Sequence, residues 1–372
     1  MHRSRILTLV LALLVALPLV MIAAAPTQAR TVDEDAIFAL VDAMEDAVLA
    51  ADAEGYLALV DQSDPVFALE HTRWVEDWAD GDLVEAYDLT VSNITVTGDE
   101  AQADLTVEWA VTTLLSTIVA SYPVRFTQDE AGTWYYAGED WVTLEGDGFL
   151  IRAFAGQEDM AAAINEFLPD VYDYTTSSLD YVPDVVLEIK LYPDEFSLGA
   201  NVLLSLPPIA GWTEPGEAIK MLARNEGPSP RVLSHEMVHF LTFEMADTSH
   251  GAFPWWVEEG IAEYVASAYW REGQIEQTLW WVQGQSMRGD FPAWETLANF
   301  EETPYEDWQY VYPGGFAFVY YLTETYGPEL RNDWLWAMAS NILIDSATMT
   351  VFMISFDDLD AAYQEWLAVY ES

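Results

Sequence analysis

The sequence predicts an α+β protein in which helices and a curved sheet come first, followed by a small mixed sheet and a largely helical remainder. Apolar residues repeat with helical period near the start of the chain, alternate with a period of two between Tyr87 and Trp141, and return to helical period from Ser229 to Trp366. Hydrophobic residues make up 52% of the 372 positions, with 16 tryptophans, so the chain can bury sizeable cores and is not disordered.

The first 29 residues are predicted to form a signal peptide. Arg3 and Arg5 precede an apolar run over residues 6–25, and Thr27-Gln28-Ala29 fits a cleavage site, which makes Arg30 the first mature residue. The apolar run is long for a signal peptide, so an uncleaved membrane anchor is the alternative. We expect a secreted, extracellular protein without stable membrane insertion once this segment is cleaved.

The chain is strongly acidic, with a formal charge of −50, and loss of Arg3 and Arg5 would bring the mature chain to −52. Such a surface repels nucleic acid and anionic membranes, so we expect neither as a partner. The charge is spread evenly and predicts a solvated acidic surface, for solubility or for a high-salt habitat. No cysteine is present, which excludes disulfides and a lipoprotein anchor.

Residues 30–147 are expected to form a first domain of two helices and two hairpins. Glu54-Gly55-Tyr56 is expected to break the first helix before a second, short one. Residues 89–96 and 101–113 flank a Gly98-Asp99 turn, and residues 122–127 and 133–141 flank a second turn. The apolar stripe of the first helix consists of Ile37, Leu40, Val41, Met44 and Val48.

Helices followed by long, curved hairpins resemble the cone-shaped nuclear transport factor-like (SnoaL-like) fold. Members of that fold often bind a ligand in the cone or mediate association, so His71 and Asp80 are the polar residues of interest there. The resemblance implies an accessory role, in substrate binding or in positioning the second domain, and no activity is assigned to residues 30–147.

The second domain is expected to span residues 148–372, after a boundary near Gly146-Asp147-Gly148. Residues 159–168 have helical period, residues 185–191 and 203–206 read as strands, and Gly211-Trp212 reads as a turn. These elements predict a small mixed sheet ahead of the helical remainder.

The pentapeptide His235-Glu236-Met237-Val238-His239 is the strongest indication of a functional site in this domain. Residues four apart share a helix face, so His235 and His239 can bind one metal ion, and Glu236 can take a proton from a water bound to it. Ser229-Pro230 upstream supplies an N-cap followed by proline at the first helical position. The motif predicts one Zn²⁺ per chain, with other divalent ions as alternatives.

A second proline-led helix is predicted from Pro254, and it offers a carboxylate as third ligand. Together, HExxH and W-x-x-E-G-x-A-E-Y resemble the gluzincin branch of the MA clan of metallopeptidases, which includes aminopeptidase N, leukotriene hydrolase and thermolysin. The resemblance implies a thermolysin-like domain. In the aminopeptidase N branch the ligand is the glutamate directly before the glycine, which implies Glu259. Counting the spacing from His239 gives Glu258, the alternative.

Two further roles follow from this resemblance. Glu263 matches the acidic residue that accepts a hydrogen bond from a ligand histidine in thermolysin-like enzymes. Tyr312 opens a segment similar to the family's Y-x-x-G-F-A-x-x-x-Y-L, whose tyrosine donates its hydroxyl to the oxyanion of the reaction intermediate. Tyr310 is the neighbour that could replace Tyr312.

These residues predict a zinc metallopeptidase that acts on peptides or proteins, with Glu236 as general base and Tyr312 as oxyanion donor. The family's aminopeptidases grip a free amino terminus with a Gly-x-Met-Glu-Asn strand segment. Residues 200–206 and 218–223, the strands expected beside the active-site helix, lack it, so an endopeptidase is expected. A non-catalytic or substrate-restricted binding protein that retains the fold is the alternative.

Overall fold

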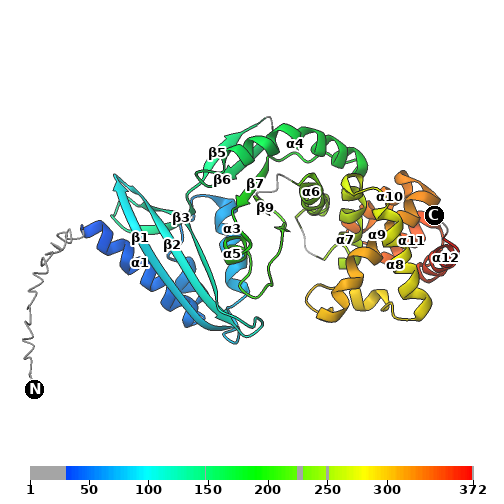
Figure 1. The fold of residues 1–372 in the computed structure, drawn as a ribbon, viewed down its shortest axis with the longest axis horizontal. Coiled ribbons are helices and arrows are strands. Elements are labelled where there is room, and N and C mark those ends of the chain that lie inside the picture. Colours follow the sequence, from blue (N-terminus) through cyan, green and yellow to red (C-terminus); the bar gives the residue numbers. More distant parts are fainter. Residues whose placement is uncertain (1–30, 147, 224–228, 249–250, 371–372) are drawn as a thin grey trace, which may run out of the picture.

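The computed structural model describes residues 31–146, 148–223, 229–248 and 251–370. The predicted signal peptide lies outside these ranges. Across them, no helix combines the length and the apolar character needed to cross a bilayer. The chain runs from an N-terminal sheet and its helices, through a second sheet, to a cluster of helices at the C-terminal end (Figure 1).

The N-terminal part pairs three helices with a four-stranded antiparallel sheet of order β1-β2-β3-β4. Its elements are α1 (Val32–Leu49), α2 (Ala53–Leu57), α3 (Pro65–Glu76), β1 (Val84–Thr97), β2 (Glu100–Val111), β3 (Ile118–Gln128) and β4 (Trp134–Glu139). Both predicted hairpins are confirmed. The first turns at Gly98, whose φ of +70° lies in the left-handed region that glycine adopts readily.

Helix α1 begins at a capping box, in which Thr31 and Glu34 exchange side-chain and backbone hydrogen bonds. All five residues of its predicted apolar stripe are buried, and the helix packs against β1. The predicted break is misplaced, because α1 ends at Leu49 and Glu54 to Tyr56 lie inside α2. Asp52 caps α2 by accepting a hydrogen bond from the backbone of Gly55, which allows a helix to start where the glycine predicted a break.

The second sheet is mixed, as predicted, with strand order β5-β6-β7-β9-β8. Its strands are β5 (Val142–Glu145), β6 (Phe149–Ala153), β7 (Leu187–Tyr192), β8 (Gly211–Trp212) and β9 (Ile219–Leu222). Strands β6, β7 and β9 are parallel, whereas β5 and β8 are antiparallel edges. Strand β5 precedes the predicted boundary near residue 147, so this sheet begins ahead of it, and the division into domains stays a prediction.

Two short elements of this region were predicted wrongly. Residues 203–206 form no strand, because Leu204 is buried in the N-terminal core and its carbonyl accepts a 3.3 Å hydrogen bond from Trp109 Nε1. Gly211 and Trp212 form strand β8 rather than a turn, since Trp212 pairs with Lys220 of β9. The edge strand next to the helix that carries the histidine pentapeptide therefore comes from a segment that the pattern assigned to a turn.

The remaining elements are helical, in keeping with the predicted α+β class. They are α4 (Glu158–Leu179), α5 (Glu195–Ala200), α6 (Pro230–Met245), α7 (Trp255–Ala266), η1 (Ser267–Tyr269), α8 (Gln274–Arg288), η2 (Trp294–Leu297), η3 (Tyr305–Asp307), α9 (Trp308–Tyr326), α10 (Pro328–Ala339), α11 (Ile344–Phe352) and α12 (Phe356–Ala368). The predicted helix over residues 159–168 continues through Pro169, because Ile164, Leu168 and Val171 bury one apolar stripe along α4.

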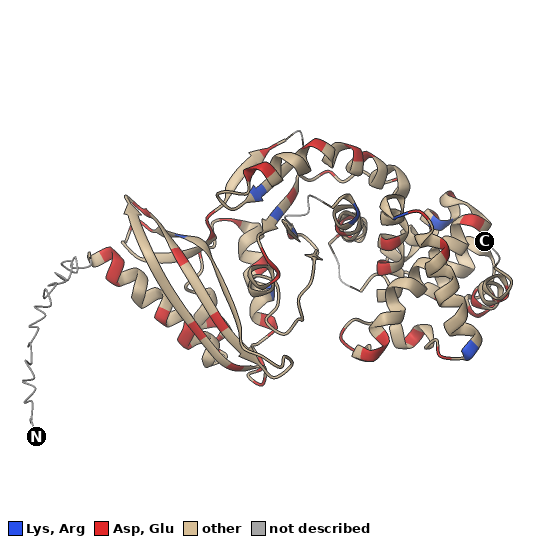
Figure 2. Ribbon diagram, in the orientation of Figure 1, with Lys and Arg blue, Asp and Glu red and all other residues tan. Residues whose placement is uncertain are grey.

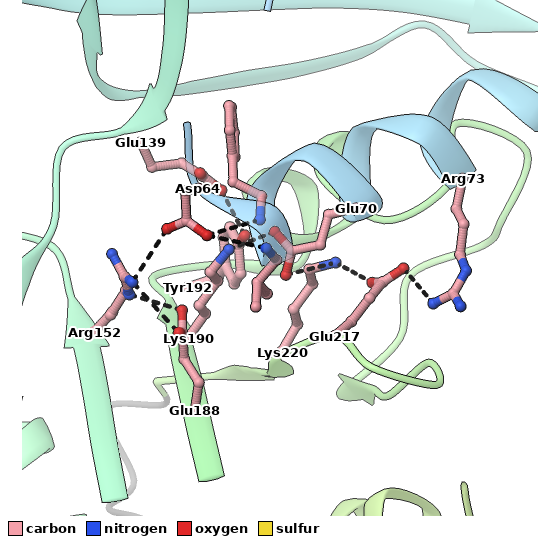
Figure 3. Close-up of polar contacts among 12 residues, drawn as sticks. Asp64, Glu70, Arg73, Glu139, Arg152, Glu188, Lys190, Tyr192, Glu217 and Lys220 are labelled. Atoms are coloured by element: carbon pink, nitrogen blue, oxygen red, sulfur yellow. Dashed lines mark hydrogen bonds and ion pairs between the residues drawn. The ribbon is translucent and has the colours of Figure 1, made fainter. Parts of the chain in front are cut away.

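The N-terminal part and the second sheet share a buried network of charges, drawn in Figure 3. Lys190 of β7 and Lys220 of β9 are the only lysines of the chain, and both pair with Glu70 of α3. Lys220 also lies 2.7 Å from Glu217, which in turn lies 2.8 Å from Arg73. Buried ion pairs need good geometry to offset the loss of hydration. This network therefore ties α3 to one register along the sheet.

Candidate metal centre

Helix α6 presents both histidines of the pentapeptide on one face. Ser229 caps the helix by accepting a hydrogen bond from the backbone of Val232, and Pro230 occupies its first turn, as predicted. The Nε2 atoms of His235 and His239 lie 3.1 Å apart, and His239 is buried. The helical spacing thus turns two ring nitrogens towards one point.

Helix α7 brings a carboxylate to the same point. Glu259 Oε2 lies 3.2 Å from Nε2 of His235 and 3.4 Å from Nε2 of His239. These three residues are the one group of histidine and acidic side chains, within the part of the chain that the structure describes, arranged to hold a metal ion. Glu258, the alternative ligand, is not a member of the group.

The spacing of the three atoms fits a metal. Zinc bonds of 2.0–2.1 Å in a tetrahedral site separate neighbouring ligand atoms by roughly 3.3 Å, close to the separations of 3.1, 3.2 and 3.4 Å found here. Glu259 Oε2 is buried without a hydrogen-bond partner, whereas Oε1 accepts a 3.0 Å hydrogen bond from Trp255 Nε1. Two imidazoles and one carboxylate are also a donor set that zinc prefers.

Behind the histidines lies Glu263, one turn after Glu259 on α7. Its Oε1 atom is 3.4 Å from Nδ1 of His235, on the far side of that ring from the candidate metal position. Arg231 of α6 in turn places Nη2 3.1 Å from Glu263 Oε2. The family resemblance predicted Glu263 beside one of the two histidines, and the structure places it beside His235.

The carboxylate of Glu236 is buried beneath strand β8. Its Oε2 atom accepts a 2.9 Å hydrogen bond from Thr213 Oγ1. A Cβ atom on Gly211 would lie 2.3 Å from Glu236 Oε1, so the glycine allows β8 to run directly against this side chain. Burial raises the pKa of Glu236, and the two imidazoles and Thr213 offset only part of that shift. A raised pKa suits a group that must take up and release a proton near neutrality.

The ligands themselves balance charge. Burial alone would lower the pKa of His235, but the carboxylates of Glu259 and Glu263 raise it well above its ordinary value. Burial alone would raise the pKa of Glu259. The two imidazoles hold this pKa below its usual range, and His239 has the larger effect. One buried and one half-buried histidine facing two carboxylates are the arrangement expected where a cation belongs.

Tyr312, from the first turns of α9, lies over the site. Its ring is stacked 6.3 Å from the ring of His235, and 36% of the residue is exposed. Burial of the hydroxyl end, followed by the charge of Glu259, raises the pKa of Tyr312 well above its ordinary value, so it stays a proton donor. Tyr310, the alternative, packs instead against Trp281 and Phe291.

The two motif segments meet at a pair of glycines. A Cβ atom on Gly315 of α9 would lie 2.1 Å from the carbonyl oxygen of Trp256, and one on Gly260 of α7 would lie 2.5 Å from the carbonyl carbon of Gly315. Helices α7 and α9 therefore touch backbone to backbone. This close crossing holds Glu259, next to Gly260, and Tyr312, one turn before Gly315, at the same site.

Strand β8 lies beside helix α6 but outside the two stretches in which a segment like Gly-x-Met-Glu-Asn was expected. Of the two stretches expected beside the active-site helix, residues 218–223 contain β9, but residues 200–206 form no strand and β8 lies outside both. Strand β8 forms the first two residues of the segment Gly211-Trp212-Thr213-Glu214-Pro215. This segment has the glycine and the glutamate of Gly-x-Met-Glu-Asn and lacks its methionine and asparagine.

Three residues that contact the site were not predicted. Trp255 precedes Glu259 by four residues and Arg231 precedes His235 by four, so helical spacing would have indicated both. Thr213 reaches Glu236 from a strand edge distant in sequence, for which the sequence holds no comparable indication.

The N-terminal part borders a small cavity of about 20 Å³, which is room for about one water. His71 lines it, and the Tyr56 hydroxyl lies 3.3 Å from its Nδ1 atom. Ala200 and Asn201, at the end of α5, line the same cavity, whereas Asp80 is exposed and does not. Desolvation lowers the pKa of His71 to about 3, so the ring is neutral.

Comparisons with known proteins give remote similarity only. No protein-family model and no curated protein matches the sequence. Native yeast LTA4 hydrolase is similar to 66% of this chain at 11% identity with a TM-score of 0.42, and the match spans 44% of the yeast protein. A conserved protein from Planctomyces limnophilus DSM 3776 is similar to 29% of this chain at 14% identity with a TM-score of 0.24, over 93% of its own length. At this level a function must be argued from the site itself.

Proposed function

We propose that this protein is a zinc-dependent metallopeptidase with endopeptidase activity. The observation that carries the proposal is the convergence of His235, His239 and Glu259 at separations that fit one tetrahedral ion. The buried Glu236 beside them adds the proton acceptor that hydrolysis requires. The proposed substrates are peptides or proteins, and we propose that the mature protein acts outside the cell.

When bound, Zn²⁺ would supply Lewis acidity, which lowers the pKa of a water and polarises the scissile carbonyl. Glu236 accepts the proton of the attacking water and passes it to the leaving amine, a transfer that suits its raised pKa. Thr213 holds the Glu236 carboxylate in place through its hydrogen bond. The Tyr312 hydroxyl donates to the oxyanion, and Glu263 fixes the ring of His235.

The incomplete Gly-x-Met-Glu-Asn segment favours an endopeptidase over an aminopeptidase. Glu214 nevertheless stands at the glutamate position of that segment, so the test must separate the two activities. Peptides offered with free and with acetylated amino termini do so, because an aminopeptidase needs the free amine and an endopeptidase does not.

The test is digestion of a mixed peptide library by the zinc-loaded chain, beside Glu236→Gln and the control Glu244→Gln. Glu244 lies on the same helix and outside the metal-binding group. We expect internal cleavage of acetylated peptides by the native chain and by Glu244→Gln, and none by Glu236→Gln, with equal zinc content in all three. Zinc-loaded native protein that cuts nothing would favour a binding protein or one restricted to a single substrate. Equal cleavage by Glu236→Gln would remove Glu236 from the mechanism.

A further inference from the structure

A pocket of about 830 Å³ is lined by residues of helices α6, α8 and α9 and of the segment before α8. Arg231 and Pro313 lie in its wall, and each is close in the chain to a residue of the centre. Arg231 is one helical turn before His235 on α6, and Pro313 directly follows Tyr312 on α9. Arg231 also contacts Glu263, whose carboxylate lies 3.4 Å from His235 Nδ1, so one residue of the pocket wall is joined to the centre through a single side chain.

The wall of this pocket is rich in positive charge for so acidic a chain. Residues 230–370 contain only four lysines and arginines, namely Arg231, Arg271, Arg288 and Arg331. Arg231 and Arg271 both line the pocket, with Glu272 as the one acidic residue in its lining. Acidic residues far outnumber basic ones along the rest of the ribbon (Figure 2). Two arginines at one opening thus make a local exception to the charge of the whole protein.

The guanidinium of Arg231 is held by two contacts, but some of its N–H groups have no hydrogen-bond partner among the described residues. It pairs with Glu263 through Nη2 and lies over the ring of Trp270, 5.4 Å from the centroid. Its side chain is 44% exposed, and no hydrogen bond from Nε or Nη1 to a described residue is present. These groups therefore face solvent in a defined orientation.

Arg271 is exposed and forms no ion pair with any residue in the described ranges. Its guanidinium is thus available as a second cation on the pocket wall. Other side chains there can donate hydrogen bonds: Gln274, Gln277, Thr278 and Gln309. An arginine presents paired N–H groups that match the two oxygens of a carboxylate, and amide and hydroxyl donors can complete its hydrogen bonding.

Building on the proposed peptidase function, we propose that this pocket binds a carboxylate of the substrate close to the cleaved bond. The carboxylate belongs either to an acidic side chain or to the C-terminus of the peptide, since both offer the same planar anion. The chain would then prefer anionic groups at one substrate position despite its net charge of −50, because contact with arginines of the pocket wall outweighs a repulsion that salt screens.

Quenched fluorogenic peptides provide the test. One series carries Glu, Gln or Lys at each position in turn, and each peptide is made with a free and with an amidated C-terminus. We expect one position at which Glu is cut at least tenfold faster than Gln in kcat/KM, or a tenfold advantage of the free C-terminus, as expected for one charge-assisted contact. The first result identifies a side-chain carboxylate and the second a terminal one. Equal rates for all three residues and both C-termini would overturn the proposal.

The matched variants are Arg271→Gln and Arg288→Gln, which remove the same charge from the same region. Arg288 is exposed, pairs with Asp290 and lies outside the pocket. Arg271→Gln should reduce the anionic preference about tenfold, whereas Arg288→Gln should keep it. A preference that both variants retain, or that both lose equally, would show that general electrostatics and not this pocket selects the substrate.

Binding to the metal-free chain separates this proposal from the peptidase proposal. Tryptophan fluorescence can follow the titration, because Trp281 lines the pocket. The acidic peptide should bind about tenfold more tightly than its amide counterpart, and Arg271→Gln should abolish the difference. If no peptide is cut while this difference persists, the peptidase function fails and the carboxylate site stands. Equal binding of both peptides would overturn the site whatever the activity.

Discussion

Trp255 Nε1 donates a 3.0 Å hydrogen bond to Glu259 Oε1, one turn further along α7. The bond holds one carboxylate oxygen and leaves Oε2 facing Nε2 of His235 and of His239. A tryptophan four residues earlier thus orients Glu259 and not its neighbour Glu258, because residues at that helical spacing share a face. This orientation is the basis on which we propose Glu259 as the ligand.

Glu259→Gln should weaken zinc binding more than about 100-fold, since loss of a ligand costs more than loss of a group that merely orients one. Glu258→Gln is the matched control and should bind zinc within a few-fold of the native chain. Competition with a chromogenic chelator measures both affinities. Loss of zinc in Glu258→Gln alone would transfer the ligand role to that residue.

Tyr312→Phe should lower kcat about 100-fold or more with KM and zinc content nearly unchanged, as expected for a group that donates only to the developing oxyanion. Tyr310→Phe, which removes only the hydroxyl of a ring packed on Trp281, should retain activity. Steady-state kinetics on the best library peptide distinguishes the two. A rise in KM at constant kcat for Tyr312→Phe would instead indicate a role in substrate binding.

Gly315→Ala should destabilise the protein by about 3 kcal/mol, because the new methyl group meets the backbone of α7, which cannot move aside as a side chain can. Gly284→Ala on α8 is the control. Its added Cβ would approach only the end of the Arg288 side chain, at 3.3 Å, and alanine favours a helix. Denaturant unfolding measures both, and equal stability of the two variants would refute the close helix crossing.

Lys220→Met should destabilise the protein by about 3 kcal/mol or more, since it leaves Glu70 and Glu217 buried with less compensation. Arg288→Met, at an exposed pair with Asp290, should change stability by less than about 1 kcal/mol. Denaturant unfolding at neutral pH gives both values. A small effect of Lys220→Met would mean that solvent reaches this network.

His71 should make the fold sensitive to mild acid. Its pKa is lowered to about 3 in the folded chain, whereas the unfolded chain takes up the proton near pH 6.5. The unfolded state therefore binds more protons between these values, and stability falls as the pH drops from 6.5 towards 3, by up to about 1.4 kcal/mol per pH unit.

The measurement for His71 is the free energy of unfolding between pH 7 and pH 5, for the native chain and His71→Gln. The native chain should lose more stability over this range, since glutamine does not titrate and all other groups are shared. Glu70 adds to the loss of stability only at lower pH. Burial would raise its pKa, but Lys190 and Lys220 outweigh this effect and hold the pKa at about 2, below its ordinary 4.5. Parallel pH profiles for the two chains would contradict the assignment to His71.

The sequence by itself determined the α+β order, both N-terminal hairpins, the stripe of α1 and the pair of histidines on α6. These features depend on local periodicity, capping and spacing along one element, all of which are readable from neighbouring residues. The family motif also pointed to Glu259, and the structure places this residue beside both histidines and next to Gly260, where α9 approaches.

Only the tertiary structure decided which residues meet across elements. Strand β8 forms at Gly211-Trp212 because β9 is there to pair with it, and residues 203–206 form no strand because the N-terminal core buries Leu204. Thr213 reaches Glu236, and two arginines gather at one pocket, through the same long-range packing. Such contacts join segments far apart in the chain and form only when the hydrophobic cores pack. No local sequence pattern predicts them for this reason.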